Sequence, residues 1–243
     1  MLNMILATVC AAAMLVPGMA SAQVTGTLGG GYTRITDGGG ADLYGLNGSL
    51  ATALGQDWNL EGSASWHRAE PGSADLWTAG GNLFLNTGFG RIAAGAIHGG
   101  LQAGHTTSYG AGADWFYSDA ITLSLKGGGY YTGAPRSENG YVGLQGIYYV
   151  QPNLALSATF DYAGVTTGGD INSQKIKAEW QFSDTLPLSV YGGYQRYESA
   201  GADLNAIFVG FKFYLDGASN LAGHHRTGSL GYIGQSLFQV GSY

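Results

Sequence analysis

Charged side chains are scarce in this chain, and their positions are the first clue to their chemistry. Lys, Arg, Asp and Glu make up 11% of the residues, and the formal net charge is −6. All four lysines and several acids lie in segments where apolar residues alternate with small or polar ones. Side chains of a strand point alternately to its two faces, so these charges share the polar face. The predicted charged set of this face is Glu61, Arg91, Asp114, Lys126, Asp161, Lys175, Lys177, Glu179 and Lys212.

These charges can act on any solute that passes or binds along the same surface. The five bases and four acids of the set predict weak selectivity between ions of opposite sign. Lys175, Lys177 and Lys212 can form a basic stripe that favours anions. Alternatively, Lys177 and Glu179 can neutralise one another, because residues two apart in a strand lie on one face. The sequence leaves both interpretations open.

Serine and histidine offer a second chemistry, nucleophilic catalysis. A nucleophilic serine needs a histidine within hydrogen-bonding reach and a third group that orients this histidine. Ser65 and His67 share a face, but no orienting acid or amide is evident, and His98 and His105 merely flank a loop. The adjacent pair His224-His225 suits metal chelation poorly. We therefore predict no catalytic residues, no metal site and no cofactor, and that the protein is not an enzyme.

The first 22 residues have the pattern of a secretory leader. An apolar run from Met4 to Val16 precedes Ala20-Ser21-Ala22, which matches a signal-peptidase site. We predict that residues 1–22 are a signal peptide and that the mature chain starts near Gln23. The only cysteine, Cys10, lies in this leader, so the mature chain would have no disulfide, thiol nucleophile or Cys-based metal site.

The elements that must position the polar face are strands. The alternation predicts an all-β fold, and no apolar run reaches the roughly 18 residues of a membrane helix. Most segments have about eleven residues, the length a tilted strand needs to cross a bilayer. The twelve predicted strands are 24–35, 43–54, 58–68, 76–86, 90–98, 106–117, 120–131, 140–150, 153–164, 171–182, 187–198 and 204–215.

The connections between these segments alternate between tight turns and longer polar loops. The tight turns are expected at 56–57, 88–89, 118–119, 151–152 and 183–184. Short turns at one end and longer loops at the other are typical of an outer-membrane barrel, in which the short turns are periplasmic. The net negative charge argues against a nucleic-acid partner.

Aromatic and small residues support the same architecture. Aromatic side chains near the strand ends suit the two membrane interfaces; they are Trp58, Trp66, Trp77, Trp115, Tyr117, Tyr148, Tyr162, Trp180, Phe182, Tyr194 and Phe213. Many inward positions are glycine, namely Gly29, Gly31, Gly45, Gly80, Gly112, Gly128, Gly143, Gly193 and Gly210. Twelve strands lie between filled and open barrels, so small inward residues favour a narrow pore; relief of strain in a curved sheet is the alternative.

At this point the chain resembles the small porin-like outer-membrane barrels of Gram-negative bacteria. The resemblance rests on the leader, on hairpins such as Trp58–Trp66, and on the closing strand Ile207–Leu215, which is similar to the final strand that the barrel-assembly machinery recognises. It implies a single antiparallel up-and-down transmembrane β-barrel over residues 23–215, of 12 strands, with 10 or 14 as alternatives. It also implies an integral outer-membrane protein, exported through the periplasm, that contacts outer-membrane lipids and that machinery.

The expected function is a porin-like channel for passive diffusion of small hydrophilic solutes, weakly selective. A non-conducting barrel that serves as an anchor or binds partners through its loops is the alternative, and a lipid-modifying enzyme is a lesser one. Residues 216–243 continue past the closing strand, where such barrels normally end. We predict a periplasmic tail or a plug in the lumen, although further strands would raise the count to 14. The solute and the oligomeric state stay open.

Overall fold

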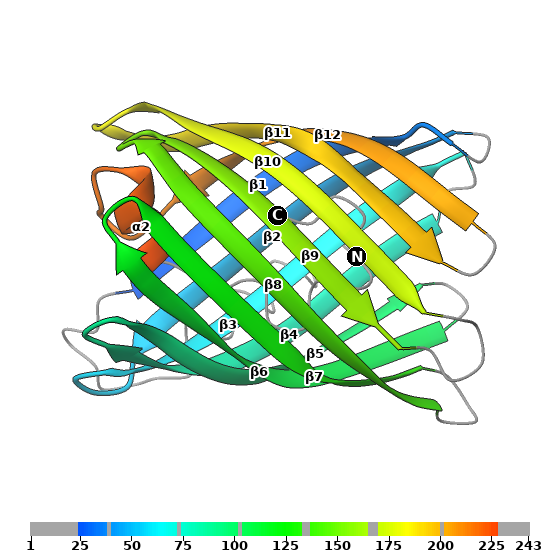
Figure 1. The fold of residues 1–243 in the computed structure, drawn as a ribbon, viewed down its shortest axis with the longest axis horizontal. Coiled ribbons are helices and arrows are strands. Elements are labelled where there is room, and N and C mark those ends of the chain that lie inside the picture. Colours follow the sequence, from blue (N-terminus) through cyan, green and yellow to red (C-terminus); the bar gives the residue numbers. More distant parts are fainter. Residues whose placement is uncertain are drawn as a thin grey trace.

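The computed structural model describes residues 24–37, 40–71, 74–101, 104–132, 137–164, 170–199 and 202–227. These residues form one closed antiparallel barrel of twelve strands, in which every strand pairs with its sequence neighbours and β1 closes on β12 (Figure 1). The strands are β1 (Val24–Ile35), β2 (Ala41–Ala53), β3 (Trp58–Glu70), β4 (Ala74–Thr87), β5 (Gly90–Leu101), β6 (Gly104–Ser118), β7 (Ile121–Thr132), β8 (Ser137–Gln151), β9 (Leu154–Ala163), β10 (Ile171–Ser183), β11 (Leu186–Ser199) and β12 (Ala202–Tyr214). The predicted up-and-down barrel is confirmed, and no strand end differs from its prediction by more than three residues.

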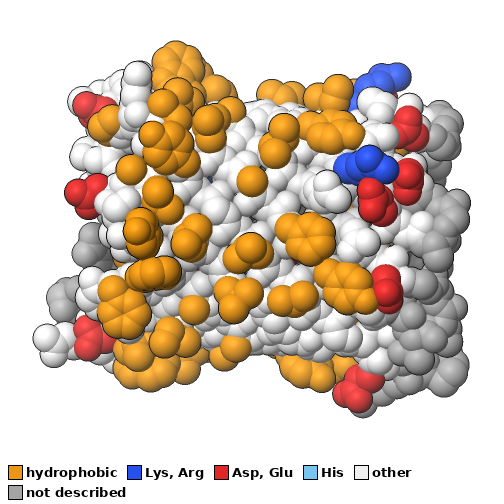
Figure 2. All heavy atoms as spheres, in the orientation of Figure 1, with side chains coloured by type: hydrophobic (Ala, Val, Ile, Leu, Met, Phe, Trp, Pro, Cys, Tyr) orange, Lys and Arg blue, Asp and Glu red, His pale blue; other side chains and the backbone are white. Residues whose placement is uncertain are grey.

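The outer surface of the barrel is apolar between its ends. On β9, Leu156 and Phe160 are 45% and 46% exposed, whereas Ala155 and Asp161, on the opposite face, are 3% and 4% exposed. On the face of the barrel that Figure 2 shows, hydrophobic side chains spread over the middle and charged ones lie at the two ends. Such a belt suits a bilayer, because a Lys or Arg on the lipid face at mid-depth costs about 2–4 kcal/mol.

The two ends of the barrel differ in their connections. Tight turns join β4 to β5, β6 to β7, β8 to β9 and β10 to β11, and we call this the turn end (left in Figure 1). The opposite end, where β1 meets β2 and β11 meets β12, is the loop end. Aromatic rings on the outer face pack in pairs near both ends, with the ring centres of Trp180 and Phe182 4.9 Å apart at the turn end and those of Tyr32 and Tyr44 5.3 Å apart at the loop end.

The chain continues beyond β12 into a short helix, α2 (Leu221–Thr227), which lies at the turn end of the barrel (Figure 1). We call residues 216–227 the C-terminal segment. The segment adds no strand, so the 14-stranded alternative is not formed by the described residues. The predicted leader, residues 1–22, and the rest of the predicted tail, residues 228–243, lie outside the described residues. No helix in the described part of the chain is long and apolar enough to cross a membrane.

Candidate functional site: the barrel lumen

All nine charged residues predicted for the polar face point into the lumen. Each lies on the strand face opposite the exposed apolar side chains, and six of them are less than 9% exposed, namely Glu61, Arg91, Asp114, Lys126, Asp161 and Glu179. Lys175, Lys177 and Lys212 are partly buried on the same face of β10 and β12. The structure brings eight of the nine together on the side formed by β5–β12, and it places Glu61 apart from them on β3.

The lumen therefore has two walls of different chemistry. We call the inward residues of β1–β4 the neutral wall, because Glu61 is its only acid or base other than His67 among the described residues. Small hydroxyl side chains pair across its strands, with Thr27 Oγ1 2.9 Å from Ser49 Oγ and Ser65 Oγ 2.8 Å from Thr78 Oγ1. This wall presents hydrogen-bonding groups with little charge.

We call the inward residues of β5–β12 the charged wall. Arg91 and Asp114 are cross-strand partners on β5 and β6, and they form a buried ion pair of 2.7 Å between Nη2 and Oδ2. Lys126 on β7 reaches over β8 to Asp161 on β9, with 2.9 Å between Nζ and Oδ1. The strand between them carries Gly143 at this level, which pairs with both residues. A Cβ at Gly143 would overlap both side chains, so this glycine makes room for the ion pair.

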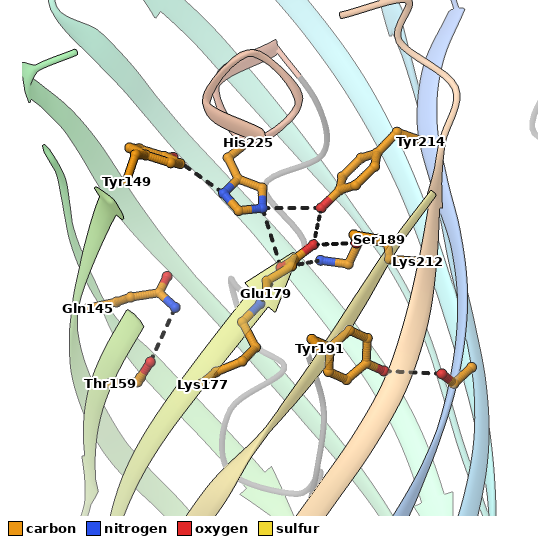
Figure 3. A network of polar contacts seen from close by, with 11 residues as sticks. Gln145, Tyr149, Thr159, Lys177, Glu179, Ser189, Tyr191, Lys212, Tyr214 and His225 are labelled. Atoms are coloured by element: carbon orange, nitrogen blue, oxygen red, sulfur yellow. Dashed lines mark hydrogen bonds and ion pairs between the residues drawn. The ribbon is translucent and has the colours of Figure 1, made fainter. Parts of the chain in front are cut away.

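The largest polar network of the charged wall is centred on the carboxylate of Glu179 (Figure 3). Lys177 Nζ lies 2.8 Å from Glu179 Oε2, Ser189 Oγ donates to Oε1 at 2.7 Å, and the Tyr214 hydroxyl donates to the same oxygen. Lys212 Nζ is 4.0 Å from Oε2. We call Glu179, Lys177, Ser189, Lys212 and Tyr214 the Glu179 cluster.

This cluster decides between the two interpretations of the lysines. Lys177 and Glu179 do pair, and Lys212 approaches the same carboxylate, so the three-lysine stripe is partly neutralised. Lys175 lies on the same face of β10 as Lys177. The wall is thus a set of compensated charges with a modest excess of bases.

The C-terminal segment enters the lumen and adds His225 to the Glu179 cluster. His225 Nε2 lies 3.4 Å from Glu179 Oε2 and 3.1 Å from the Tyr214 hydroxyl, and its Nδ1 lies 3.3 Å from the Tyr149 hydroxyl (Figure 3). Arg91 Nη2 donates to the His225 carbonyl at 2.8 Å. Burial lowers the pKa of the His225 imidazole, although Glu179 opposes this effect. The pattern of the strands did not predict these contacts; the polar run Gly223-His-His-Arg226 was the only signal.

The segment is also organised internally. Asn220 caps α2, because its Oδ1 accepts the Gly223 amide at 2.9 Å. Asp216 Oδ1 and His224 Nδ1 are 2.6 Å apart, and both residues are buried. Burial alone would raise the pKa of the Asp216 carboxyl, but the hydrogen bonds from His224 and the Ala218 amide lower it below its ordinary value. The carboxylate is therefore ionised at neutral pH and holds the segment in this conformation.

Ser65 and His67 lie on one face of β3, and the rings of His98 and His105 stack with their centroids 5.5 Å apart. Ser65 pairs with Thr78 across the neutral wall, and His98 Nδ1 lies 2.8 Å from the Thr107 hydroxyl on the outer surface. His224 Nδ1 faces Asp216 and His225 Nε2 faces Glu179, so the two rings direct these nitrogens at different carboxylates. No group of three or more His, Cys, Asp or Glu able to hold a metal is found among the described residues.

Comparison with known proteins shows which solved structures share the fold of this barrel. Neither a protein-family model nor a curated protein matches the sequence. Solved structures do match: the KdgM porin, with a TM-score of 0.57 and 7% identity over 77% of this chain and 98% of that one, and the NanC porin, with 0.60 and 8% over 77% and 98%. The chain has the fold of small outer-membrane porins. An outer-membrane channel from Pseudomonas putida F1 aligns with a TM-score of 0.56 and 11% identity, over 82% of this chain and 99% of the channel.

Proposed function

We propose that the protein is an outer-membrane channel through which small hydrophilic solutes diffuse passively and with weak selectivity. The observation that carries this proposal is the division of the barrel into an apolar outer surface and a lumen lined by polar side chains. Solved structures with the same fold, among them two named porins and one outer-membrane channel, support it.

Weak selectivity follows from how the lumen charges are arranged. The ion pairs Arg91–Asp114, Lys126–Asp161 and Lys177–Glu179 each present opposite charges within 3 Å of one another. The field of such a pair falls off much faster with distance than that of a single charge, so a passing ion meets little net potential. The hydroxyl groups of the neutral wall can replace some of the hydrogen bonds that a solute makes with water.

Partners and location are part of the same proposal. Outer-membrane lipids would contact the apolar belt, and the aromatic pairs near both barrel ends suit the two headgroup regions. The leader pattern supports export through the periplasm, and the aromatic-rich strand before Leu215 supports recognition by the barrel-assembly machinery. The solutes of the channel would be small and hydrophilic, and they would pass through the lumen without chemical change.

Conductance across a planar bilayer tests this proposal. The full chain, expressed from its complete sequence and purified from membranes in detergent, should give stepwise currents in potassium chloride. Under a salt gradient, the reversal potential should lie close to zero, because paired charges discriminate weakly. Vesicles that contain the protein should also swell in solutions of small neutral sugars. Folded protein that neither conducts nor admits sugars would contradict the channel and favour the anchoring barrel.

A further inference from the structure

We propose that residues 216–227 form an autoinhibitory plug that narrows the turn end of the lumen along the charged wall. This inference rests on the proposed channel function, because a plug has an effect only in a conducting barrel. Three observations support it. The segment makes hydrogen bonds to several strands, its helix packs against inward apolar side chains, and the charged residues of the barrel keep ion-pair partners when the segment is absent.

The segment is held from many sides of the lumen. Arg226 Nη2 donates to the Ser118 carbonyl at the end of β6 and lies 3.4 Å from the Ile121 carbonyl at the start of β7. The Leu221 amide donates to the Pro152 carbonyl in the β8–β9 turn at 3.0 Å. Together with the contacts of His225 to β5, β8, β10 and β12, these bonds tie the segment to most strands of the charged wall.

Apolar contacts seat the helix in the same place. Leu221 is fully buried and packs with Tyr149, Ala155 and Tyr214, which come from three different strands. The Arg226 guanidinium lies 5.0 Å from the centre of the Phe116 ring and 5.5 Å from that of Tyr149. A helix seated on inward residues from several strands occupies part of the cross-section through which a solute must pass at the turn end.

The ion pairs of the barrel and of the segment indicate that the segment can leave the lumen without stranding a buried charge. Without it, Glu179 keeps Lys177, Ser189 and Tyr214 as partners, and Arg91 keeps Asp114. Asp216 and His224 pair within the segment itself, so they also stay matched. Since removal of one partner from a buried ion pair is strongly destabilising, a permanent core element would be expected to complete such pairs. Among the described residues, the buried carboxylate that pairs across the interface is Glu179, with His225, and it keeps Lys177 as a partner when the segment leaves.

A reversible cross-link tests the plug directly. Ala155 and Leu221 are buried in one cluster, and the only natural cysteine is Cys10, so A155C with L221C places one cysteine pair there, and loss of free thiols verifies its oxidation. In the full chain, we expect the oxidised protein to conduct at least twofold less than the same molecules after addition of a reductant. A155C and L221C alone serve as controls and should not respond to reductant.

A loosened plug provides the converse test, independent of the cross-link. H225A with R226A removes the side-chain contacts of these two residues to β6, β7, β10 and β12 without changing a barrel strand, and we expect mean conductance to rise at least twofold. H98A with R196A changes the same residue types at exposed positions of the barrel and should have no effect. Equal currents from all folded variants would overturn the plug and leave the channel standing. No current from any folded variant would instead contradict the channel function.

Discussion

The neutral wall and the charged wall belong to one sheet and share one lumen, yet they are built differently. On β1–β4, many inward positions are Ser, Thr, Asn or Gly, and contacts such as that of Ser65 with Thr78 join adjacent strands. On β5–β12, long charged side chains reach further, as Lys126 does from β7 to Asp161 on β9. The C-terminal segment is seated against the charged wall. The comparison suggests that the charged wall is the regulated side of the lumen and the neutral wall the side that stays available to solutes.

Glycines show the same difference between the walls. A Cβ at Gly45 on the neutral wall would overlap the imidazole of His67 on the next strand. A Cβ at Gly143 on the charged wall would overlap the two members of an ion pair that spans it. Both glycines make room for a neighbouring side chain. The sequence allowed the interpretation that small inward residues leave a narrow open pore. At these two positions the space beside the glycine is instead occupied by a neighbouring side chain, so small inward residues do not by themselves indicate open volume.

Among substitutions in the charged wall, we expect E179A to cause the largest loss of stability. It leaves Lys177 and Lys212 facing each other in a buried site, and the loss of one partner of a buried ion pair costs about 3–5 kcal/mol. The free energy of unfolding in urea, measured in lipid vesicles, should fall by that amount. The double variant E179A with K177M removes the charge of both partners and should recover part of the loss. A double variant no more stable than E179A would show that the charge of Lys177 is not the cause.

A smaller loss of stability is expected from a side chain at Gly143, the β8 residue over which Lys126 and Asp161 form their ion pair. G143A adds a methyl group where those two side chains pass, and overpacking of this kind costs about 1–3 kcal/mol. G146A is the matched control on the outer face of the same strand, where the nearest atom to an added Cβ is Leu123 Cδ2 at 3.8 Å. Urea unfolding should separate the two variants. Equal stabilities would mean that the ion pair does not depend on the glycine.

The sequence predicted the strands and the inward positions well because both follow from alternation within single strands. The alternation of side chains along a strand is enough to predict that Lys126, Lys177 and Glu179 face the lumen. Which charges meet depends on register across several strands, so the pair of Lys126 with Asp161 was not predicted. The C-terminal segment could not be placed either, because a short helix seated by tertiary contacts has no periodic signal of its own.

The smallest expected effect comes from adding one charge to the neutral wall, and it sharpens the comparison most directly. Ser63 faces the lumen on β3, between Ser49 and Gly80, so S63K places an ammonium group where few charges exist. An unpaired unit charge changes the energy of an ion 4 Å away in water by about 1 kcal/mol, downward for an anion and upward for a cation, which limits the rise in the anion-to-cation permeability ratio to about thirtyfold.

Reversal potentials under a dilute salt gradient measure this ratio, and the shift should shrink in 1 M salt, where the Debye length is about 3 Å. S63Q adds a long side chain without charge and should leave the ratio as it is in the unchanged protein. If S63K also leaves the ratio unchanged while the channel still conducts, ions do not pass along the neutral wall. The solute path would then have to follow the charged wall, beside the segment that we propose as its plug.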